Sequence, residues 1–406
     1  MMTEYETRHA EKDQPSSSAC PVCNTKAGSA FFDLRHVPVF CNVLWVEKTR
    51  AAGAAKGDVK LVCCEGCGLI YNAAFDASKV EYAPDYENAL HFSQRFQIFA
   101  EQLAEGLIER HGLTGKTVAE IGCGDGYFLK QMVKAGACKG IGFDPSMERH
   151  DKRGFVGESV EIVPKAFQTG NLPTHFDLVI CRHVLEHLRD PLGLLASIRE
   201  AVGKRQSALY FEVPNTTWIL ESCSLWDFIY EHYTYWTRST LGALFARAGF
   251  HVLETATGFG NQFVMIEADT SEHAEASVRA EADAKEQVTV CQRFGKAAKR
   301  HLDRWQHELG VFAGSGRKVA VWGAGSKGVT FVNAVPAALE AVACLVDLNP
   351  RKQGKFVAGS AHPILAPERL AELQPDVVII PNALYEQEIG AELSKMGVEA
   401  ELKTLQ

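Results

Sequence analysis

A glycine-rich turn between an apolar strand and a helix is the clearest group of residues in this chain that could do chemistry. It carries one acidic residue and three glycines in the spacing E-x-G-x-G-x-G: Glu120, Gly122, Gly124 and Gly126. Asp144 ends the next apolar strand, twenty residues after Gly124. Glycines let a ligand approach the backbone, and an acidic side chain at the tip of the following strand can accept both hydroxyls of a ribose. Because a dinucleotide site has the spacing G-x-G-x-x-G, this turn indicates a nucleoside without a phosphate.

Two further residues belong to the same predicted cofactor site. Pro145 follows Asp144 directly, and Arg182 lies in the loop after the strand expected at 176–180. That loop is at the carboxyl end of the sheet, where open α/β sheets bind ligands. The alternative is a strand-turn-helix unit whose glycines serve only packing.

Two pairs of cysteines near the N-terminus have the spacing of metal ligands. They form two C-x-x-C motifs: Cys20, Cys23, Cys64 and Cys67. Four thiolates suit a closed tetrahedral Zn²⁺ site, whose role is to hold together a segment too short to build its own core. Cys63 is a rival of Cys64, which we prefer because it completes the motif. The alternatives are unrelated thiols and a zinc ribbon that binds nucleic acid, although Lys and Arg are few and dispersed here.

Groups that can move protons are concentrated in two segments in the middle of the chain. They are His183 and His187 in the loop 181–187, and Tyr230, Glu231 and His232 in the aromatic run 226–236. Histidine is the usual general base because its pKa is near working pH. Glu231 could orient the ring of His232 or hold its charge, and tyrosines can donate to an oxygen that becomes anionic. The alternatives are histidines that serve as scaffold and an aromatic insertion packed as core.

A second glycine-rich turn lies near the C-terminus. Its spacing is G-x-G-x-x-G from Gly323 to Gly328, and Asp347 ends the next strand. We predict that this loop, and Asn215 from the middle of the chain, bind the substrate. The loop residues concerned are Gly325, Ser326 and Lys327. Lys327 inside the turn favours a diphosphate, while NAD(P) and a pure scaffold are the alternatives.

Composition excludes several classes of function. The chain has 406 residues, 46% hydrophobic and 23% charged, with a net charge of −8. No apolar run reaches the ~18 residues of a membrane span, and the polar N-terminus lacks the apolar core of a signal peptide. A cytoplasmic location is expected. The negative charge argues against a broad nucleic-acid surface, since phosphate binding needs clustered Lys and Arg.

The pattern of elements predicts an α/β protein in several parts. We expect a disordered tail at 1–18, a zinc-binding domain at 19–75, linker helices at 76–112, an α/β domain at 113–268, a connecting helix at 269–312 and a C-terminal Rossmann-like domain at 313–406. Strand-helix alternation in 113–268 implies a parallel sheet with helices on both faces.

The first glycine turn resembles motif I of class I S-adenosylmethionine (SAM) methyltransferases. Cysteine knuckles, this motif, a Glu-His pair and a glycine-rich C-terminal domain follow one another as in the sugar C-methyltransferases. The resemblance covers about 19–406 and implies a central SAM-binding domain, structural zinc and a C-terminal domain that closes over a nucleotide sugar. Members of that family methylate nucleotide-linked 4-keto-deoxysugars.

The resemblance also implies roles for single residues. The general base would be His232, with Glu231 beside it, and His187 would line the site. A tyrosine ahead of the SAM domain also contributes in that family, and we assign Tyr86 rather than Tyr82. One departure concerns the tyrosine that the family often has two residues before the glutamate, because this chain has Ile229 there and Tyr230 one residue later.

We therefore expect a SAM-dependent enzyme that methylates carbon on a nucleotide-linked keto-deoxysugar. The expected partner is this small molecule, with no nucleic acid and no membrane, and the protein would be a monomer or small homo-oligomer. The alternatives are an O- or N-methyltransferase on a related sugar or small acid, and a zinc protein that senses SAM without catalysis.

Overall fold

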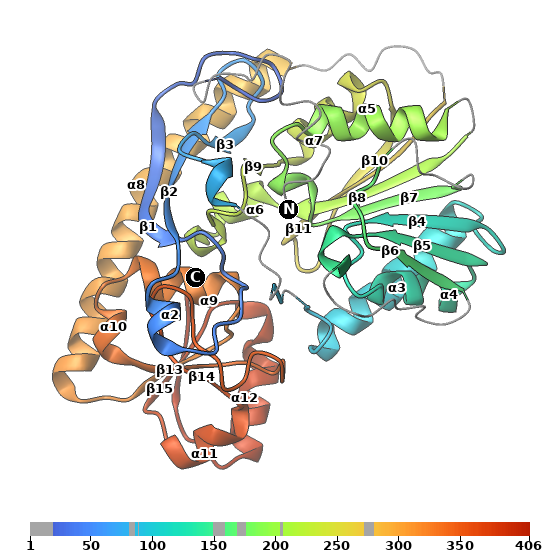
Figure 1. Cartoon of the computed structure of the whole chain (residues 1–406). Coiled ribbons are helices and arrows are strands. Elements are labelled where there is room, and N and C mark those ends of the chain that lie inside the picture. Colours follow the sequence, from blue (N-terminus) through green and yellow to red (C-terminus); the bar gives the residue numbers. More distant parts are fainter. Residues whose placement is uncertain are drawn as a thin grey trace.

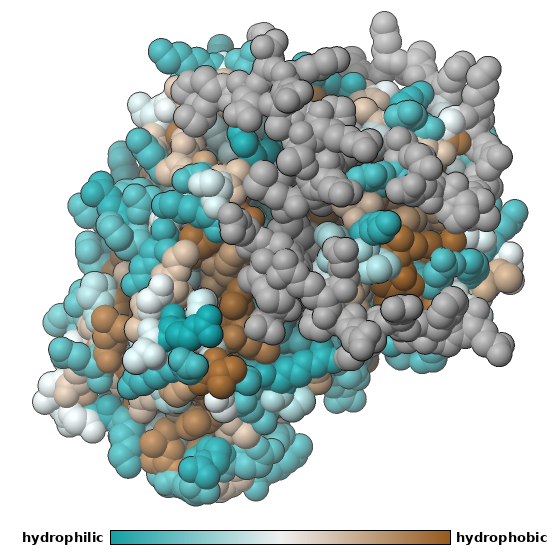
Figure 2. Space-filling model, in the orientation of Figure 1, coloured by the Kyte–Doolittle hydropathy of each residue, from teal (hydrophilic) through white to brown (hydrophobic). Residues whose placement is uncertain are grey.

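The computed structural model shows three connected parts (Figure 1). It describes residues 19–80, 86–87, 89–148, 159–168, 176–203, 206–271 and 280–406. The tail expected at 1–18 and Tyr82 lie outside these ranges. No helix of the described residues is long and apolar enough to cross a membrane. The face of the molecule in Figure 2 is a mosaic of hydrophilic and hydrophobic residues.

The central part is a seven-stranded sheet in the order β10-β11-β8-β7-β4-β5-β6. The strands are β4 (Thr117–Ile121), β5 (Lys139–Phe143), β6 (Val160–Val163), β7 (Leu178–Arg182), β8 (Ala208–Pro214), β10 (His251–Gly258) and β11 (Phe263–Asp269). Strands β4 to β8 are parallel, as the sequence predicts. The parallel expectation is wrong for β11, which is antiparallel to both β8 and β10. Four residues join β10 to β11, and so short a connection permits only an antiparallel pair.

Helices cover both faces of this sheet. They are α3 (Gln94–Arg110), α4 (Tyr127–Ala135), α5 (Pro191–Val202) and α7 (Arg238–Arg247). The short helix α6 (Thr216–Glu221) instead packs into the core of the N-terminal and C-terminal parts. Val118 on β4 packs into the cluster under α3 and α4, while its neighbour Ala119 packs into the cluster under α5 and α7. Successive residues of a strand point to opposite faces, so an unbroken apolar strand is what a sheet buried on both sides requires.

The N-terminal part is a four-stranded antiparallel sheet in the order β1-β2-β3-β9. Its elements are β1 (Ala30–Pro38), α2 (Lys48–Ala52), β2 (Lys56–Cys63) and β3 (Ile70–Asn72), followed by a 3₁₀ turn, η1 (Ala77–Lys79). The fourth strand, β9 (Thr234–Tyr235), comes from the aromatic run of the central part. The segment that carries His232 is therefore built into the N-terminal sheet.

The C-terminal part is a five-stranded parallel sheet in the order β14-β13-β12-β15-β16. Its strands are β12 (Val319–Trp322), β13 (Val342–Val346), β14 (Ile364–Leu365), β15 (Val377–Ile380) and β16 (Glu401–Thr404). Its helices are α9 (Ser326–Ala334), α10 (Ala338–Ala341), α11 (Leu370–Leu373) and α12 (Glu386–Lys395), with the 3₁₀ turns η6 (Pro367–Arg369) and η7 (Ala383–Tyr385). The long helix α8 (Ala280–Ser315) leads into this sheet.

Helix α8 joins the N-terminal and C-terminal parts into one core (Figure 1). Phe294 on α8 packs edge-on against Phe32 of β1, with ring centroids 5.5 Å apart, and against Phe228, at 5.4 Å. A Cβ at Gly295 would lie 1.9 Å from the carbonyl oxygen of Phe31, so the helix touches the strand backbone and has no room for a side chain there. The N-terminal part therefore has no apolar core of its own.

We predict that Phe294→Ala lowers the free energy of unfolding by about 3–5 kcal/mol, because the truncation leaves a cavity where three elements meet. Ile98→Ala is the control, since Ile98 on α3 is 47% exposed and its truncation should cost less than ~1 kcal/mol. Urea unfolding followed by tryptophan fluorescence measures both, and similar losses in the two variants would contradict a shared core at Phe294.

Candidate functional site

The first glycine turn connects β4 to α4 and is open on one side. Gly122, Gly124 and Gly126 all have positive φ, at 74°, 52° and 75°. A Cβ at Gly122 would lie 2.2 Å from Val184, whereas a Cβ at Gly124 would meet no described atom within 4 Å. Gly122 is thus required for packing, while the space at Gly124 is available to a ligand.

Asp144 ties the turn to the end of β5. Its Oδ2 accepts a hydrogen bond from the backbone N–H of Gly124 at 2.8 Å, and its Oδ1 accepts one from Ser146 at 2.8 Å. Each carboxylate oxygen keeps a second lone pair, so the ribose role expected for Asp144 remains chemically open. Pro145 begins a short 3₁₀ turn, η2 (Pro145–Glu148), just after it.

Glu120 is buried beneath the turn with an unused acceptor. Its Oε2 has no hydrogen-bond partner among the described residues. Burial raises its pKa to about 8, against the opposing effect of Arg182. A buried acceptor without a partner is costly, and a cationic or N–H-bearing ligand in the turn would supply one.

Arg182 is placed differently from the cofactor contact that the sequence predicted. It is buried, pairs with Glu212 on β8 at 2.9 Å and lies over the ring of Phe128, 4.2 Å from its centroid. The guanidinium therefore faces the interior beside the sheet, where it balances the charge of a buried carboxylate. We correct its assignment to a structural role.

His183, in the loop after β7, is held as a cation. Its φ is 54°, and its ring lies 3.0 Å from a Glu212 oxygen and 3.6 Å from a Glu186 oxygen. Burial lowers the pKa of His183, but the two carboxylates outweigh burial and raise this pKa to about 9. A histidine that is already protonated at neutral pH cannot accept a proton, so His183 is not a general base in this state.

His187 and His232 face each other, with ring centroids 4.8 Å apart. His187 lies in the 3₁₀ turn η4 (Leu185–His187), and its Nδ1 donates to the carbonyl oxygen of Glu231 at 3.0 Å. His232 is neutral because burial and the neighbouring His187 lower its pKa to about 3. Its Nδ1 is buried without a partner in the described part of the chain. This imidazole has a free nitrogen that can accept a proton, but a pKa this low makes it a weak base, so it needs a nearby anion to stabilise the imidazolium if it is to act as one.

Glu231 does not support the ring of His232 in the way that its place in the sequence suggested. Its carboxylate accepts from the backbone N–H of Cys41 at 2.7 Å and from the hydroxyl of Tyr86. Burial raises the pKa of both Glu231 and Tyr86. Glu231 lies in a turn that the backbone N–H of His232 closes on the carbonyl oxygen of Ile229 at 3.3 Å, and its carboxylate is directed to Cys41 and Tyr86 rather than to His232.

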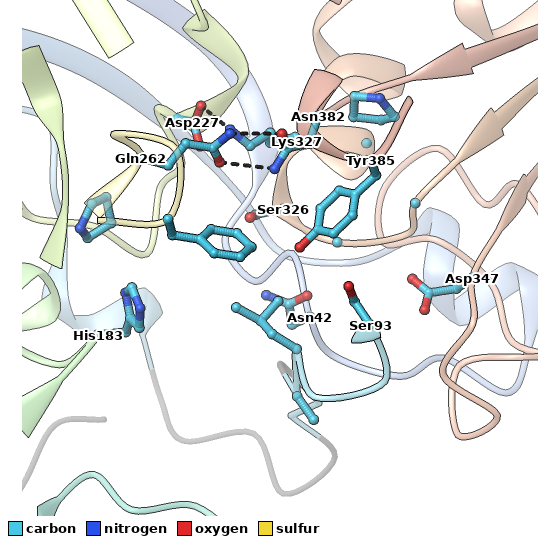
Figure 3. Close-up of a pocket in the computed structure, with 18 of the residues that line it drawn as sticks. Asn42, Ser93, His183, Asp227, Gln262, Ser326, Lys327, Asp347, Asn382 and Tyr385 are labelled. Carbon is cyan, nitrogen blue, oxygen red and sulfur yellow. Dashed lines mark hydrogen bonds and ion pairs between the residues drawn. The ribbon is translucent and has the colours of Figure 1, made fainter. Parts of the chain in front are cut away.

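One cavity of about 390 Å³ brings the three histidines and Tyr86 together with the second glycine turn, whereas the first glycine turn and Asp144 are not among the residues that line it. Its polar lining comes from all three parts: Asn42 and Tyr86; Ser93, His183, Glu186, His187, Asp227, His232 and Gln262; and Gly325, Ser326, Lys327, Asp347, Lys352, Asn382, Tyr385, Glu388 and Glu392. Figure 3 shows His183 and Gln262 on one side of this space and Asp347, Asn382 and Tyr385 on the other. Two regions of the sequence that we predicted separately therefore share one site.

The wall at the second glycine turn is polar and already paired. Gly325 caps α9, and Lys327 in its first turn contacts Asp227 at 2.6 Å (Figure 3). The Nζ of Lys327 also lies over the ring of Trp218. Asp347 accepts from the backbone N–H of Ala324 at 3.0 Å. A phosphate that binds Lys327 must therefore compete with the carboxylate of Asp227.

An amide pair closes the site between the central and C-terminal parts. The side chain of Gln262 donates to Asn382 at 2.8 Å and accepts from it at 2.9 Å (Figure 3). Tyr385, from the same C-terminal loop, hydrogen-bonds Ser93 at the start of α3. These contacts fix the two walls of the cavity relative to each other.

The two cysteine pairs converge outside the cavity. The Sγ atoms of Cys20 and Cys67 are 3.6 Å apart, those of Cys23 and Cys64 are 3.3 Å apart, and all four lie within 4.8 Å of one another. Tetrahedral Zn–S bonds of ~2.3 Å require four sulfurs at this kind of separation. The donor set fits the metal that the sequence predicted.

Two segments of the chain, in the central and C-terminal parts, match known protein families. Residues 92–255 match the family described as "Methyltransferase domain", and residues 261–400 match "C-methyltransferase C-terminal domain". C-methyltransferase NovU of Streptomyces niveus is 27% identical over 305 residues, which cover 71% of each chain. The chain is a SAM-dependent methyltransferase, and it carries a domain that matches the C-terminal domain of C-methyltransferases.

Other similarities of this methyltransferase are confined to part of the chain. A ubiquinone biosynthesis O-methyltransferase of Histophilus somni is 34% identical over 119 residues, which are 27% of this chain and 49% of that protein. The solved structure of a magnesium protoporphyrin IX methyltransferase from Synechocystis, with SAH bound, covers 44% of this chain and 84% of its own, at 17% identity and a TM-score of 0.34. The chain thus spans about half of the O-methyltransferase.

Two more predicted site residues of the methyltransferase lie away from the described lining of the cavity. The hydroxyl of Tyr230 accepts from the backbone N–H of Asp76 at 2.8 Å, and its ring stacks on Phe75. Asn215 caps α6 by accepting from Thr217 at 3.1 Å. Both polar groups are occupied in building the fold, so we withdraw their catalytic and substrate-binding assignments.

Several residues of the cavity were missed by reasoning from the sequence. Glu186, Asp227, Gln262, Asn382 and Tyr385 all line it. Glu186 carried a usable signal, because Glu186-His187 repeats the Glu-His dipeptide of Glu231-His232. The others are brought together only by the contact between the central and C-terminal parts.

We predict that Asp144→Ala weakens SAM binding by roughly 1–3 kcal/mol, because hydrogen bonds to an ionised acceptor are lost. Asp177→Ala is the matched control, since Asp177 also accepts from a backbone N–H, that of Thr117, but at the opposite end of β4. Calorimetric titration with SAM measures both variants. Unchanged affinity in Asp144→Ala would rule out the ribose contact.

Proposed function

We propose that this methyltransferase moves the methyl group of SAM to a carbon next to a ketone on a nucleotide-linked deoxysugar. The observation that carries the proposal is the shared cavity, in which a neutral His232 and the second glycine turn line the same space. One substrate with a diphosphate at one end and a carbon acid at the other would contact both groups. An O- or N-methyltransferase needs no base for a carbon acid.

His232 is the proposed base. It takes the proton from the carbon next to the ketone, and the electrons of that C–H bond form an enolate. SAM held at the first glycine turn and Asp144 would supply the methyl group for the enolate carbon from its sulfonium, which would leave as the thioether, and His232 would keep the proton. The Nδ1–H of His187 is donated to the backbone carbonyl oxygen of Glu231. The other ring nitrogen, Nε2, must therefore be protonated before His187 can donate to the ketone oxygen.

The lining of the cavity supports a nucleotide-linked sugar. Gly325 and Ser326 present the N-terminus of α9, where backbone N–H groups favour an anion. Lys352 is a second cation in the wall, although its Nζ already donates to Asn42 and to the carbonyl oxygen of Ala324. Ile229 adds an apolar wall on the other side, which suits a deoxygenated carbon.

We infer that Cys20, Cys23, Cys64 and Cys67 hold one structural Zn²⁺. Four thiolates leave no open position for substrate, so the metal would have no direct part in methyl transfer. It would brace the turn that leads into β3, in a part of the chain that has no apolar core of its own.

Metal analysis of the purified protein is expected to give about one Zn²⁺ per chain. Cys23→Ser should lose the metal and unfold at lower temperature, whereas Cys138→Ser should keep it, because Cys138 is exposed and far from the four sulfurs in the sequence. Four freely titratable thiols and no metal in the native protein would contradict the zinc site.

His232→Ala is expected to lose about 10²–10⁴-fold in methyl transfer, the usual contribution of a general base, while SAM still binds. Exchange of the substrate's α-proton with deuterated water, in the presence of a SAM analogue that cannot transfer methyl, isolates the step. The assay uses a panel of keto and non-keto nucleotide sugars. Exchange at the wild-type rate in His232→Ala would place the base elsewhere, and methylation of non-keto sugars would refute the carbon-acid mechanism.

A further inference from the structure

Two Glu-His dipeptides, Glu186-His187 and Glu231-His232, lie next to each other at the cavity. Each hydrogen-bonds to the segment of the other. His187 follows Glu186 in the sequence, yet its Nδ1 donates to the carbonyl oxygen of Glu231. The carbonyl oxygen of Glu186 in turn accepts from the backbone N–H of Tyr233 at 2.9 Å. Each dipeptide is thus hydrogen-bonded to the segment that carries the other.

The side chains are paired in the same way, with Glu186 rather than Glu231 near the ring of His232. One ligand atom of each of Glu186, His187 and His232 lies within 4.8 Å of the others, and Glu231 is outside this group. The Glu186 side chain is nearly fully buried, and apart from the ion pair with His183 at 3.6 Å its carboxylate oxygens have no partner in the described part of the chain. Glu231 is occupied by Cys41 and Tyr86 instead.

We propose that Glu186, and not Glu231, is the carboxylate that supports His232 as general base, so that the two Glu-His dipeptides work as crossed pairs. This inference rests on the proposed function for the role of His232. The buried charge of Glu186 lies close enough to favour the imidazolium that forms when His232 takes the substrate proton. Glu186 then acts through His232, as a positioning residue that does not touch the substrate.

The surroundings of Glu186 fit a proton-transfer role better than a metal centre. The titratable groups that face it are His183 and His187 on its own loop, His232 and Tyr235 on the aromatic run, and Cys181 at the end of β7. His183 lies 3.6 Å from its carboxylate and already balances its charge. Burial raises the pKa of Glu186, but these histidines outweigh burial and lower it, so the carboxylate stays ionised.

Glu186→Gln tests the proposal because it removes the charge and keeps the shape. We expect the rate of α-proton exchange and kcat to fall about 100-fold, at the lower end of what a general base contributes, while KM and SAM affinity change less than about twofold. The isotope effect of an α-deuterated substrate on kcat should grow, because proton removal becomes slower. Glu186→Asp should recover part of the rate, which a merely structural defect would not allow.

Glu231→Gln is the matched comparison. It should mainly raise KM, because the Glu231 side chain holds Tyr86, and it should leave the isotope effect on kcat unchanged, because the contact of His187 with the Glu231 backbone carbonyl is kept. If Glu231→Gln raises the isotope effect and Glu186→Gln does not, the pairs are not crossed. Stimulation of the wild type by Mn²⁺ or Co²⁺, lost in Glu186→Gln, would overturn the proposal in favour of a metal centre.

A readout without substrate separates this proposal from the proposed function. In full-length protein labelled with ¹⁵N-histidine, the ring signals of His232 should move in Glu186→Gln and stay nearly in place in Glu231→Gln. Signals that respond only to Glu231→Gln would refute the crossing whatever the substrate is. The wild type could give the expected NMR result and yet show no α-proton exchange. That outcome would support the crossed geometry and refute the carbon-acid function. It would also remove the catalytic role of Glu186.

Discussion

The site depends on the hydrogen-bonded crossing of two segments at the carboxyl end of the central sheet. The backbone N–H of Tyr233 binds the carbonyl of Glu186, and the ring of His187 binds the carbonyl of Glu231. The second segment continues directly into β9, where Thr234 pairs with Tyr71 on β3. The position of His232 over the central sheet is therefore determined by a strand that starts just after the second cysteine pair. This gives the N-terminal cysteines an effect on the cavity although they do not line it.

Buried charges at the same edge of the sheet decide which histidine can react. Arg182, Glu212, His183 and Glu186 alternate in sign from the interior toward the cavity. An unpaired buried charge costs several kcal/mol, so each member of this row holds the next in its ionised form. His183 is consequently a cation. His232 stands beyond the end of the row, and burial leaves it neutral with a free nitrogen.

The local residue spacing predicted helices, strands and turns correctly in many places. The contacts of the site residues depend on segments that are far apart in the sequence. The spacing from Glu120 to Gly126 predicted the first turn because positive φ at three glycines is a local requirement. Tyr230 and Asn215 were assigned wrongly because their polar groups bind Asp76 and cap α6, which no spacing reveals. The pairing of Glu231 with His232 failed because the Glu231 carboxylate is bound by Cys41 and Tyr86, which lie far from it in the sequence. The antiparallel β11 escaped prediction because its short connection to β10 was not recognised as a hairpin.

The proposed chemistry would bring a carbanion and a sulfonium together in this cavity, and such a pair requires two rigid walls that exclude water. Water near an enolate would return the proton before the methyl group arrives, so the site has to exclude solvent while the carbon acid is ionised. The paired amides of Gln262 and Asn382 join the walls, and the contact of Tyr385 with Ser93 joins them again at the start of α3. Both contacts come from the C-terminal part, which carries the second glycine turn as well. The part that carries the proposed diphosphate site therefore also closes the cavity, and under the proposed function this would link recognition of the distant end of a substrate to protection of its reactive end.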